Sequence, residues 1–272
     1  MSEFFDIFNY SFFQLALIGV CIISVASAMV GTYIITRRLV AISGGVTHAC
    51  FGGLGLGYFL GVNPILMAAV FAVASSLGVE HLAHKHRIRE DSAIAVIWAI
   101  GMAIGVLFVF LTPGYVPELN TFLFGNILTI SLTDVIIFAI FTLTLILFFA
   151  LKFRQIVTIA FDRDFARVSG LPVRFVSTVM TVMVALCIVL TIRLVGVMLL
   201  MSMLSLPIMI AEVYFHRFKQ LMLASVGISL FACLVGLFVG AVVEVPCSAL
   251  IVIILATLFI IAKISQAVTR KI

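Results

Sequence analysis

The sequence predicts an all-α fold, a polytopic membrane helix bundle with about nine (eight to nine) transmembrane helices. Hydrophobic residues make up 64% of the 272 residues and charged residues only 10%, whereas a soluble domain carries about 25% charged residues. The apolar residues form long continuous runs, such as 138–151 and 250–262. Continuous runs of this kind are typical of membrane helices and differ from the alternating pattern of a spanning β-barrel.

The positions of the basic residues predict which side of the membrane each loop occupies. With nine spans and the N-terminus outside, all but one of the 16 Lys and Arg residues lie on the inner side, and Arg193 alone lies outside. Cytoplasmic loops carry this excess, so the C-terminus is expected in the cytoplasm. The expected spans cover about 12–35 and 39–60, a third that follows an outer turn at 63–64 and ends near 80, and then about 92–111, 132–151, 173–192, 195–213, 221–243 and 246–264.

The segments outside the spans are short, so we expect a single transmembrane domain over residues 1–272. The Phe-rich residues 1–11 are expected to form a short helix in the membrane interface. Residues 112–120 form an outer loop that contains no basic residue. Residues 121–131 are too few to cross a bilayer core of about 30 Å, and we expect a re-entrant or interfacial segment there.

His48 is the most interior ionisable residue of the predicted spans. In a helix it shares one face with small residues, namely Ala41, Gly45, Gly52 and Gly55, and small residues let a second helix approach closely. The imidazole is therefore expected to face protein or an internal cavity. One interpretation is a metal or proton site on a translocation path, because neutral imidazole ligates transition metals. The other is a histidine bonded to a neighbouring backbone group.

A second group of ionisable residues follows the third span. Glu80, His81, His84 and His86 lie close together in the sequence, and Glu80 and His84 are one helical turn apart. Such residues can hold a divalent metal. Their basic neighbours favour a solvated inner loop instead, and the arrangement is not the HExxH pattern of zinc proteases.

The longest polar insert, residues 152–174, contains the segment FDRDFARVSGLPVR. Phe161, Phe165 and Val168 can form one apolar face of a short helix, which Gly170 and Pro172 then end. A short amphipathic helix that protrudes into the cytoplasm predicts a docking site for a partner. The alternative is an interfacial loop.

The chain is not expected to be an enzyme. ISGGV, residues 42–46, is superficially similar to the signature of an ATP-binding cassette, but it lies in an apolar span. No GxxxxGK phosphate loop is present, and no nucleophile–base pattern supports a membrane enzyme. The excess of Lys and Arg over Asp and Glu is explained by membrane topology and by anionic lipid, so nucleic-acid binding is not expected.

Five segments, in order, resemble the permease subunits of ATP-binding-cassette importers for zinc, manganese and iron ions. TRRLVAISGGVTHACFGGLGLGYFLG is similar to the family pattern RRL…GDxxSHAxxxGxxLGYLLG, and FDRDFARVSGLPVR is similar to FDPEFARxxGLPV. The other three segments are EDSAIAVIWAIGMAIGVLF, FLFGNILTIS and RLVGVMLLMSMLSLPIMIA.

The resemblance implies a permease in a prokaryotic plasma (inner) membrane, with alternating access driven by partner ATPases. It implies a cytoplasmic ATP-binding subunit, a second copy of the chain and an extracytoplasmic metal-binding protein as partners, besides membrane lipid. The chain itself would bind no cofactor, since ATP is used by the partner. His48 stands at the family's SHA position and would ligate the metal transiently. The residues that would couple a short cytoplasmic helix to the ATPase are Phe161, Asp162, Phe165, Ala166, Arg167, Gly170, Leu171 and Pro172.

Two positions depart from the family pattern. Gly44 replaces the Asp that precedes the family's histidine by four residues, and Asn126 replaces a frequent Asp. The loss of the first carboxylate, at Gly44, is expected to change the ion that passes or the partners of His48. The alternatives are a passive or proton-coupled channel or carrier that acts without an ATPase, and an ATP-driven importer of metal chelates.

Overall fold

The computed structural model describes residues 10–85, 89–113, 125 and 127–269. The expected interfacial helix of residues 1–11 and the outer loop 112–120 lie almost entirely outside these residues, as do Asn126 and most of the first half of the 121–131 segment. His86 and the side chain of His84 also lie outside the description.

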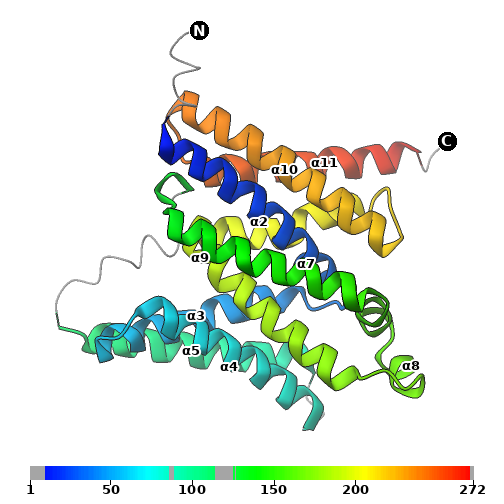
Figure 1. Cartoon of the computed structure of the whole chain (residues 1–272), viewed down its shortest axis with the longest axis horizontal. Coiled ribbons are helices and arrows are strands. Elements are labelled where there is room, and N and C mark those ends of the chain that lie inside the picture. The colour runs from blue at the N-terminus through cyan, green and yellow to red at the C-terminus, as the bar shows by residue number, and fades with distance from the viewer. Residues whose placement is uncertain (1–9, 86–88, 114–124, 126, 270–272) are drawn as a thin grey trace. The chain divides into compact units, whose positions relative to one another are not determined.

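The described chain is helical, and eight of its helices are long and apolar enough to cross a membrane. The predicted all-α polytopic bundle is therefore confirmed (Figure 1). The elements are α2 (Ser11–Thr36), α3 (Val40–Leu60), α4 (Pro64–Lys85), α5 (Glu90–Leu111), the 3₁₀ helix η2 (Ile127–Thr129), α7 (Leu132–Phe161), α8 (Arg163–Val168), α9 (Val173–Ala211), α10 (Phe218–Val243) and α11 (Cys247–Thr269).

The difference between eight helices and nine predicted spans lies in α9. Its 39 residues would measure about 58 Å as one α-helix, roughly twice the bilayer core. Gly196, with φ 81° and ψ 170°, is not helical and divides α9 into two helical segments. The division falls next to the boundary predicted between residues 192 and 195.

Helix α7 is longer than the predicted span 132–151. It continues past the non-helical Lys152, with φ −118° and ψ 16°, as far as Phe161. The continuation buries Ile156, Ile159 and Ala160, which share one helical face through their spacing of three and four. The first part of the predicted polar insert is therefore a packed helix rather than a loop.

The chain divides into two compact units, each built from separate segments. Unit 1 contains Met1–Thr32, Thr121–Leu147 and Leu194–Ile272, and unit 2 contains Tyr33–Asn120 and Phe148–Arg193. The non-helical residues of α7 and α9 lie within a few residues of the points where the chain passes between units. That residues 1–272 form a single domain stays a prediction.

In unit 2, glycines allow α3 to pack closely against both α4 and α5 (Figure 1). A Cβ on Gly55 would lie 2.5 Å from the carbonyl oxygen of Gly105, and one on Gly52 would lie 2.7 Å from that of Gly101. On another side of α3, a Cβ on Gly53 would lie 2.5 Å from the Met67 carbonyl oxygen. The predicted small-residue face of this span is thus confirmed, and α5 is the helix that packs against this face.

In unit 1, small residues again bring helices together. Gly236 and Gly240 of α10 face Ile251 and Cys247 of α11. Gly125, with φ 60°, lies against the backbone of Val195 at the break in α9. Two of the segments that carry the family resemblance therefore meet in space, although about seventy residues separate them in the sequence.

Candidate functional site

His48 lies in the middle part of α3 and is half-buried. Its ring stacks on Trp98 of α5, with 4.8 Å between the ring centroids and 6° between the planes. Among the described residues, the imidazole makes no hydrogen bond, so the interpretation of a histidine bonded to neighbouring backbone finds no partner there. Trp98 is 45% exposed, and the stacked pair therefore lies at the border of the unit 2 core.

His48 by itself would supply one metal ligand. Within the described parts of the chain, no three His, Cys, Asp or Glu side chains come close enough to hold a metal ion together. Gly44, one helical turn before His48, adds no ligand. This arrangement differs from a structural metal site, which has four closely placed protein ligands.

Glu80 takes part in a different cluster from the one considered in the sequence. Helix α4 continues to Lys85, and His81 is exposed to solvent. Both carboxylate oxygens of Glu80 are hydrogen bonded, one to Arg163 and one to Thr181. The alternative that Glu80 ligates a metal together with His81 is therefore not supported by the described geometry.

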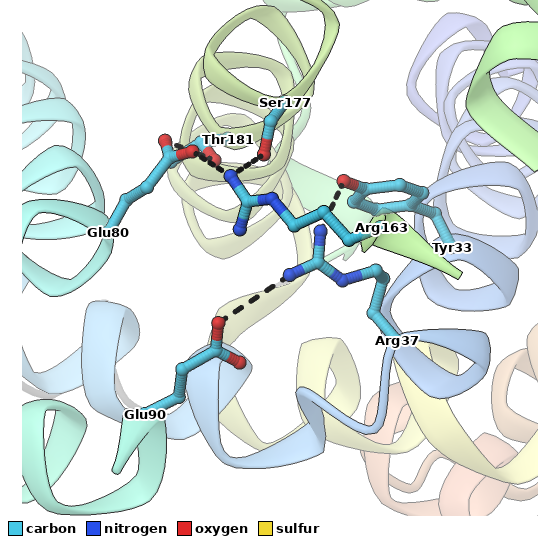
Figure 2. Close-up of polar contacts among 7 residues, drawn as sticks. All are labelled: Tyr33, Arg37, Glu80, Glu90, Arg163, Ser177 and Thr181. Atoms are coloured by element: carbon cyan, nitrogen blue, oxygen red, sulfur yellow. Dashed lines mark hydrogen bonds and ion pairs between the residues drawn. The ribbon is translucent and has the colours of Figure 1, made fainter. Parts of the chain in front are cut away.

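Seven side chains of unit 2 form what we call the Arg163 cluster (Figure 2). Arg163 Nη2 donates hydrogen bonds to Glu80 Oε1 and to Ser177 Oγ, both at 3.2 Å. Thr181 Oγ1 donates to Glu80 Oε2, also at 3.2 Å. Beside them, Arg37 Nη2 lies 3.5 Å from Glu90 Oε1, and Arg37 Nη1 lies 3.5 Å from the Tyr33 hydroxyl.

The charges of the Arg163 cluster are balanced and mostly removed from solvent. The side chains of Arg37, Glu80 and Arg163 are 10%, 17% and 18% exposed, and Glu90 is 36% exposed. Burial, and next the positive charge of Arg37, lower the pKa of Arg163, whereas Glu80 opposes this shift. The cluster was not expected from the sequence because its members come from three segments, 33–37, 80–90 and 163–181, that are more than 40 residues apart. Each charged member alone resembles a solvated span end.

Helix α8 is only six residues long, and both of its ends are capped. At its start, Asp162 Oδ1 accepts hydrogen bonds from the backbone N–H groups of Asp164 at 3.0 Å and Phe165 at 2.9 Å, as a helix N-cap does. At its end, Gly170 has φ 74°, and Leu171 N–H donates to the Ala166 carbonyl at 3.1 Å. With the bond from Gly170 N–H to the Arg167 carbonyl, this is a Schellman motif.

The apolar side chains around α8 point to solvent. Phe161, Phe165 and Val168 are 65%, 61% and 90% exposed, whereas Ala166 is fully buried. The prediction that Phe161 belongs to the same short helix is wrong: Phe161 ends α7, because Asp162 starts a new helix. The exposed apolar patch on two neighbouring helices nevertheless lies where the docking segment was predicted.

The remaining predicted coupling residues surround this patch. Arg167 Nη1 lies 3.4 Å from Asp164 Oδ1 on the surface of α8. Leu171 is half-buried and Pro172 is exposed, directly before α9 begins. The end of α7, the N-cap Asp162, the six-residue helix α8 and the turn after it together hold all the residues that the resemblance assigned to coupling.

Comparison with known proteins identifies the family to which the chain belongs. A model of the ABC 3 transport family matches residues 9–266. The chelated iron transport system membrane protein YfeD of Yersinia pestis is 30% identical, over 94% of this chain and 86% of that one. The manganese transport system membrane protein MntC of Halalkalibacterium halodurans is 26% identical, over 96% and 90%.

A solved structure has the same fold over nearly the whole chain. The structure of PsaBC from Streptococcus pneumoniae in complex with Fab matches with a TM-score of 0.83 and 27% identity, covering 96% of this chain and 94% of that one. The chain therefore belongs to the ABC 3 transport family: it is the membrane permease subunit of an ABC-type metal import system, in which a separate subunit hydrolyses ATP.

Proposed function

We propose that this permease carries a divalent transition-metal ion, zinc, manganese or iron, into the cell, and that ATPase subunits docked on α8 drive it. The relatives named above serve manganese and chelated-iron transport, which supports a metal as cargo. The observation that carries the proposal is the exposed apolar side chains of α8, held on a helix capped at both ends. A channel or carrier that acts without an ATPase has no use for such a helix.

The geometry of α8 fits insertion into a groove of a partner protein. A short helix that presents apolar side chains typically docks in this way. Because the caps fix its conformation, little conformational entropy is lost on binding. Phe165 is the expected anchor, since buried aromatic residues dominate binding energies at interfaces.

His48 is the proposed contact for the ion in transit. An ion that must leave again needs weak, temporary ligands, and a single imidazole meets this need. With Gly44 in place of an Asp, the helical turn from Gly44 to His48 offers the imidazole nitrogen as a ligand but no carboxylate oxygen. Imidazole suits zinc and iron, whereas carboxylates suit manganese, so the substitution favours zinc or iron as the cargo.

The proposed topology has nine crossings, with the N-terminus outside and the C-terminus in the cytoplasm of a prokaryote. Counting the two segments of α9 as separate crossings keeps the basic segments around Lys152 and Arg217 on the same side, as the positive-inside rule requires. We expect the working unit to contain two copies of this chain, two ATPases and an extracytoplasmic metal-binding protein.

Co-purification of the ATPase with the tagged permease tests the docking site. Phe165→Ala should reduce the recovered ATPase by about tenfold, because aromatic anchors contribute 1–2 kcal/mol or more. Phe231→Ala is the matched control, since Phe231 is 55% exposed in the middle of α10, and it should not change recovery. Equal ATPase recovery with wild type and Phe165→Ala would contradict docking on α8.

A further inference from the structure

The first residue of α8 is held by two transmembrane helices at once. Arg163 Nη2 donates to Glu80 on α4 and to Ser177 on α9, and Thr181 on α9 bonds the other oxygen of Glu80 (Figure 2). An arginine in the first turn of a helix is unfavourable for the helix dipole. The contacts to α4 and α9, rather than the stability of α8, therefore account for the position of its guanidinium.

From this geometry we propose that Glu80 and Arg163 are a positioning pair that transmits movement of α8 to α4 and α9, and so couples ATP hydrolysis to transport. The inference rests on the proposed docking of an ATPase on α8. Among the described residues, Arg163 is the one side chain of α8 that hydrogen bonds to another helix. Besides the chain connections of α8 to α7 and α9, this guanidinium is therefore a route by which a force on the exposed face of α8 reaches α4 and α9.

The Glu80–Arg163 pair is largely shielded from solvent, which strengthens the attraction between its two charges. The two side chains are 18% and 17% exposed, and water screens charges less in such a site than at the surface. By contrast, Arg89 and Asp91, 3.7 Å apart, form an exposed pair in the same unit, with side chains 85% and 63% exposed. Exposed pairs of this kind contribute little, so Arg89 offers a matched control.

The surroundings of the Glu80–Arg163 pair allow the two side chains to move without leaving either charge unpaired. Arg37 and Glu90 lie beside it, so two positive and two negative groups are present. The adjoining cavity of about 30 Å³ can hold a water molecule, for which about 10–15 Å³ is enough. Arg163 Nε and Ser76 Oγ, which line this cavity, are buried and have no hydrogen-bond partner among the described residues. A polar, charge-balanced pocket of this kind suits a pair of side chains whose geometry changes during transport.

The test uses the complete complex of permease and ATPase in proteoliposomes, with Zn²⁺ and Mn²⁺ as the probes. Three quantities are measured for each variant: ATPase recovered, ATP hydrolysed, and metal imported per ATP. Arg163→Glu and Glu80→Arg should each keep ATPase recovery but lower metal imported per ATP by about tenfold, a usual size for coupling between sites. The double variant Glu80→Arg/Arg163→Glu should recover most of the loss, and Arg89→Glu should behave as wild type.

Glu80→Gln covers the case in which a charge reversal prevents folding. It keeps the shape and one acceptor oxygen, replaces the other oxygen with an NH2 donor and removes the charge, and it should lower metal imported per ATP with normal membrane abundance. A wild-type ratio in Glu80→Gln, or no recovery in an assembled double variant, would overturn the positioning role. Failure of the docking proposal is a different result: the ATPase would then remain bound to the Phe165→Ala variant.

Discussion

At the scale of single residues, His48 is the side chain that the proposed ion path uses most directly. His48→Ala removes one imidazole that makes no hydrogen bond among the described residues. We expect metal uptake by the ATPase-bearing complex to fall at least about tenfold, as loss of groups that support a metal typically costs. His81→Ala is the control, because His81 is an exposed imidazole on α4, and it should transport normally.

The glutamine variant separates ligation from packing. His48→Gln keeps a polar side chain that can lie against Trp98 but ligates transition metals poorly. It should therefore transport as badly as His48→Ala while its complex assembles normally. Full transport by His48→Gln across zinc, manganese and iron would show that His48 serves packing and that the ion passes elsewhere.

A second prediction concerns the glycines that let α3 approach α5. Gly55→Ala places a Cβ 2.5 Å from the Gly105 carbonyl oxygen, and overpacking of this kind typically costs about 1–3 kcal/mol. Thermal unfolding of the purified permease should therefore begin at a lower temperature. The control, Gly227→Ala on α10, meets no atom within 4 Å and should be neutral or slightly stabilising. Equal melting of wild type and Gly55→Ala would mean that the two helices are less tightly packed than described.

At the scale of elements, the caps decide whether α8 exists as a helix. Isolated helices of six residues are not stable in water, so α8 depends on the hydrogen bonds that Asp162 Oδ1 accepts from two backbone N–H groups. Asp162→Ala should weaken binding of the ATPase about fivefold, because loss of an N-cap costs about 1 kcal/mol. Titration of the ATPase onto immobilised permease measures this. Asp162→Asn retains a capping side chain and should bind nearly as wild type, whereas equal losses in both variants would point to the charge instead.

The helices were predictable from the sequence because long apolar runs with charged ends specify membrane spans. Two features of the elements were not. The continuation of α7 beyond Lys152 depends on burial of Ile156 and Ile159, which tertiary packing provides. The break of α9 at the single residue Gly196, where φ is 81°, has no sequence signal that distinguishes it from the short outer turn that was expected.

The candidate site was predictable only where its residues are close in the sequence. Asp162, Phe165 and Gly170 lie in one segment, and their roles as cap, exposed side chain and helix end follow from local rules. The Arg163 cluster was not predictable, since Glu80 and Arg163 meet only after the chain folds. A charged residue at the end of a span is ordinarily expected to face water, and nothing in the sequence marks Glu80 as paired.

At the scale of the whole molecule, the two segments of α9 decide the topology. If both cross the membrane, Arg154 and Lys219 lie on the same side, and if α9 crosses once they lie on opposite sides. Single cysteines at these exposed positions, in a background without the 5 native cysteines, should both label only after permeabilisation. A cysteine at Glu244 should label from outside. Labelling of Lys219→Cys in intact cells would contradict nine crossings.

We expect this chain to move metal only when a separate ATPase drives it. The most direct measurement is uptake of Zn²⁺, Mn²⁺ and Fe²⁺ into proteoliposomes that contain the permease alone or with its ATPase, each with ATP and with a non-hydrolysable analogue. We expect accumulation above the external concentration only with both the ATPase and ATP, and stronger uptake of zinc or iron than of manganese. Equal uptake by the permease alone would contradict it and would identify a channel or carrier.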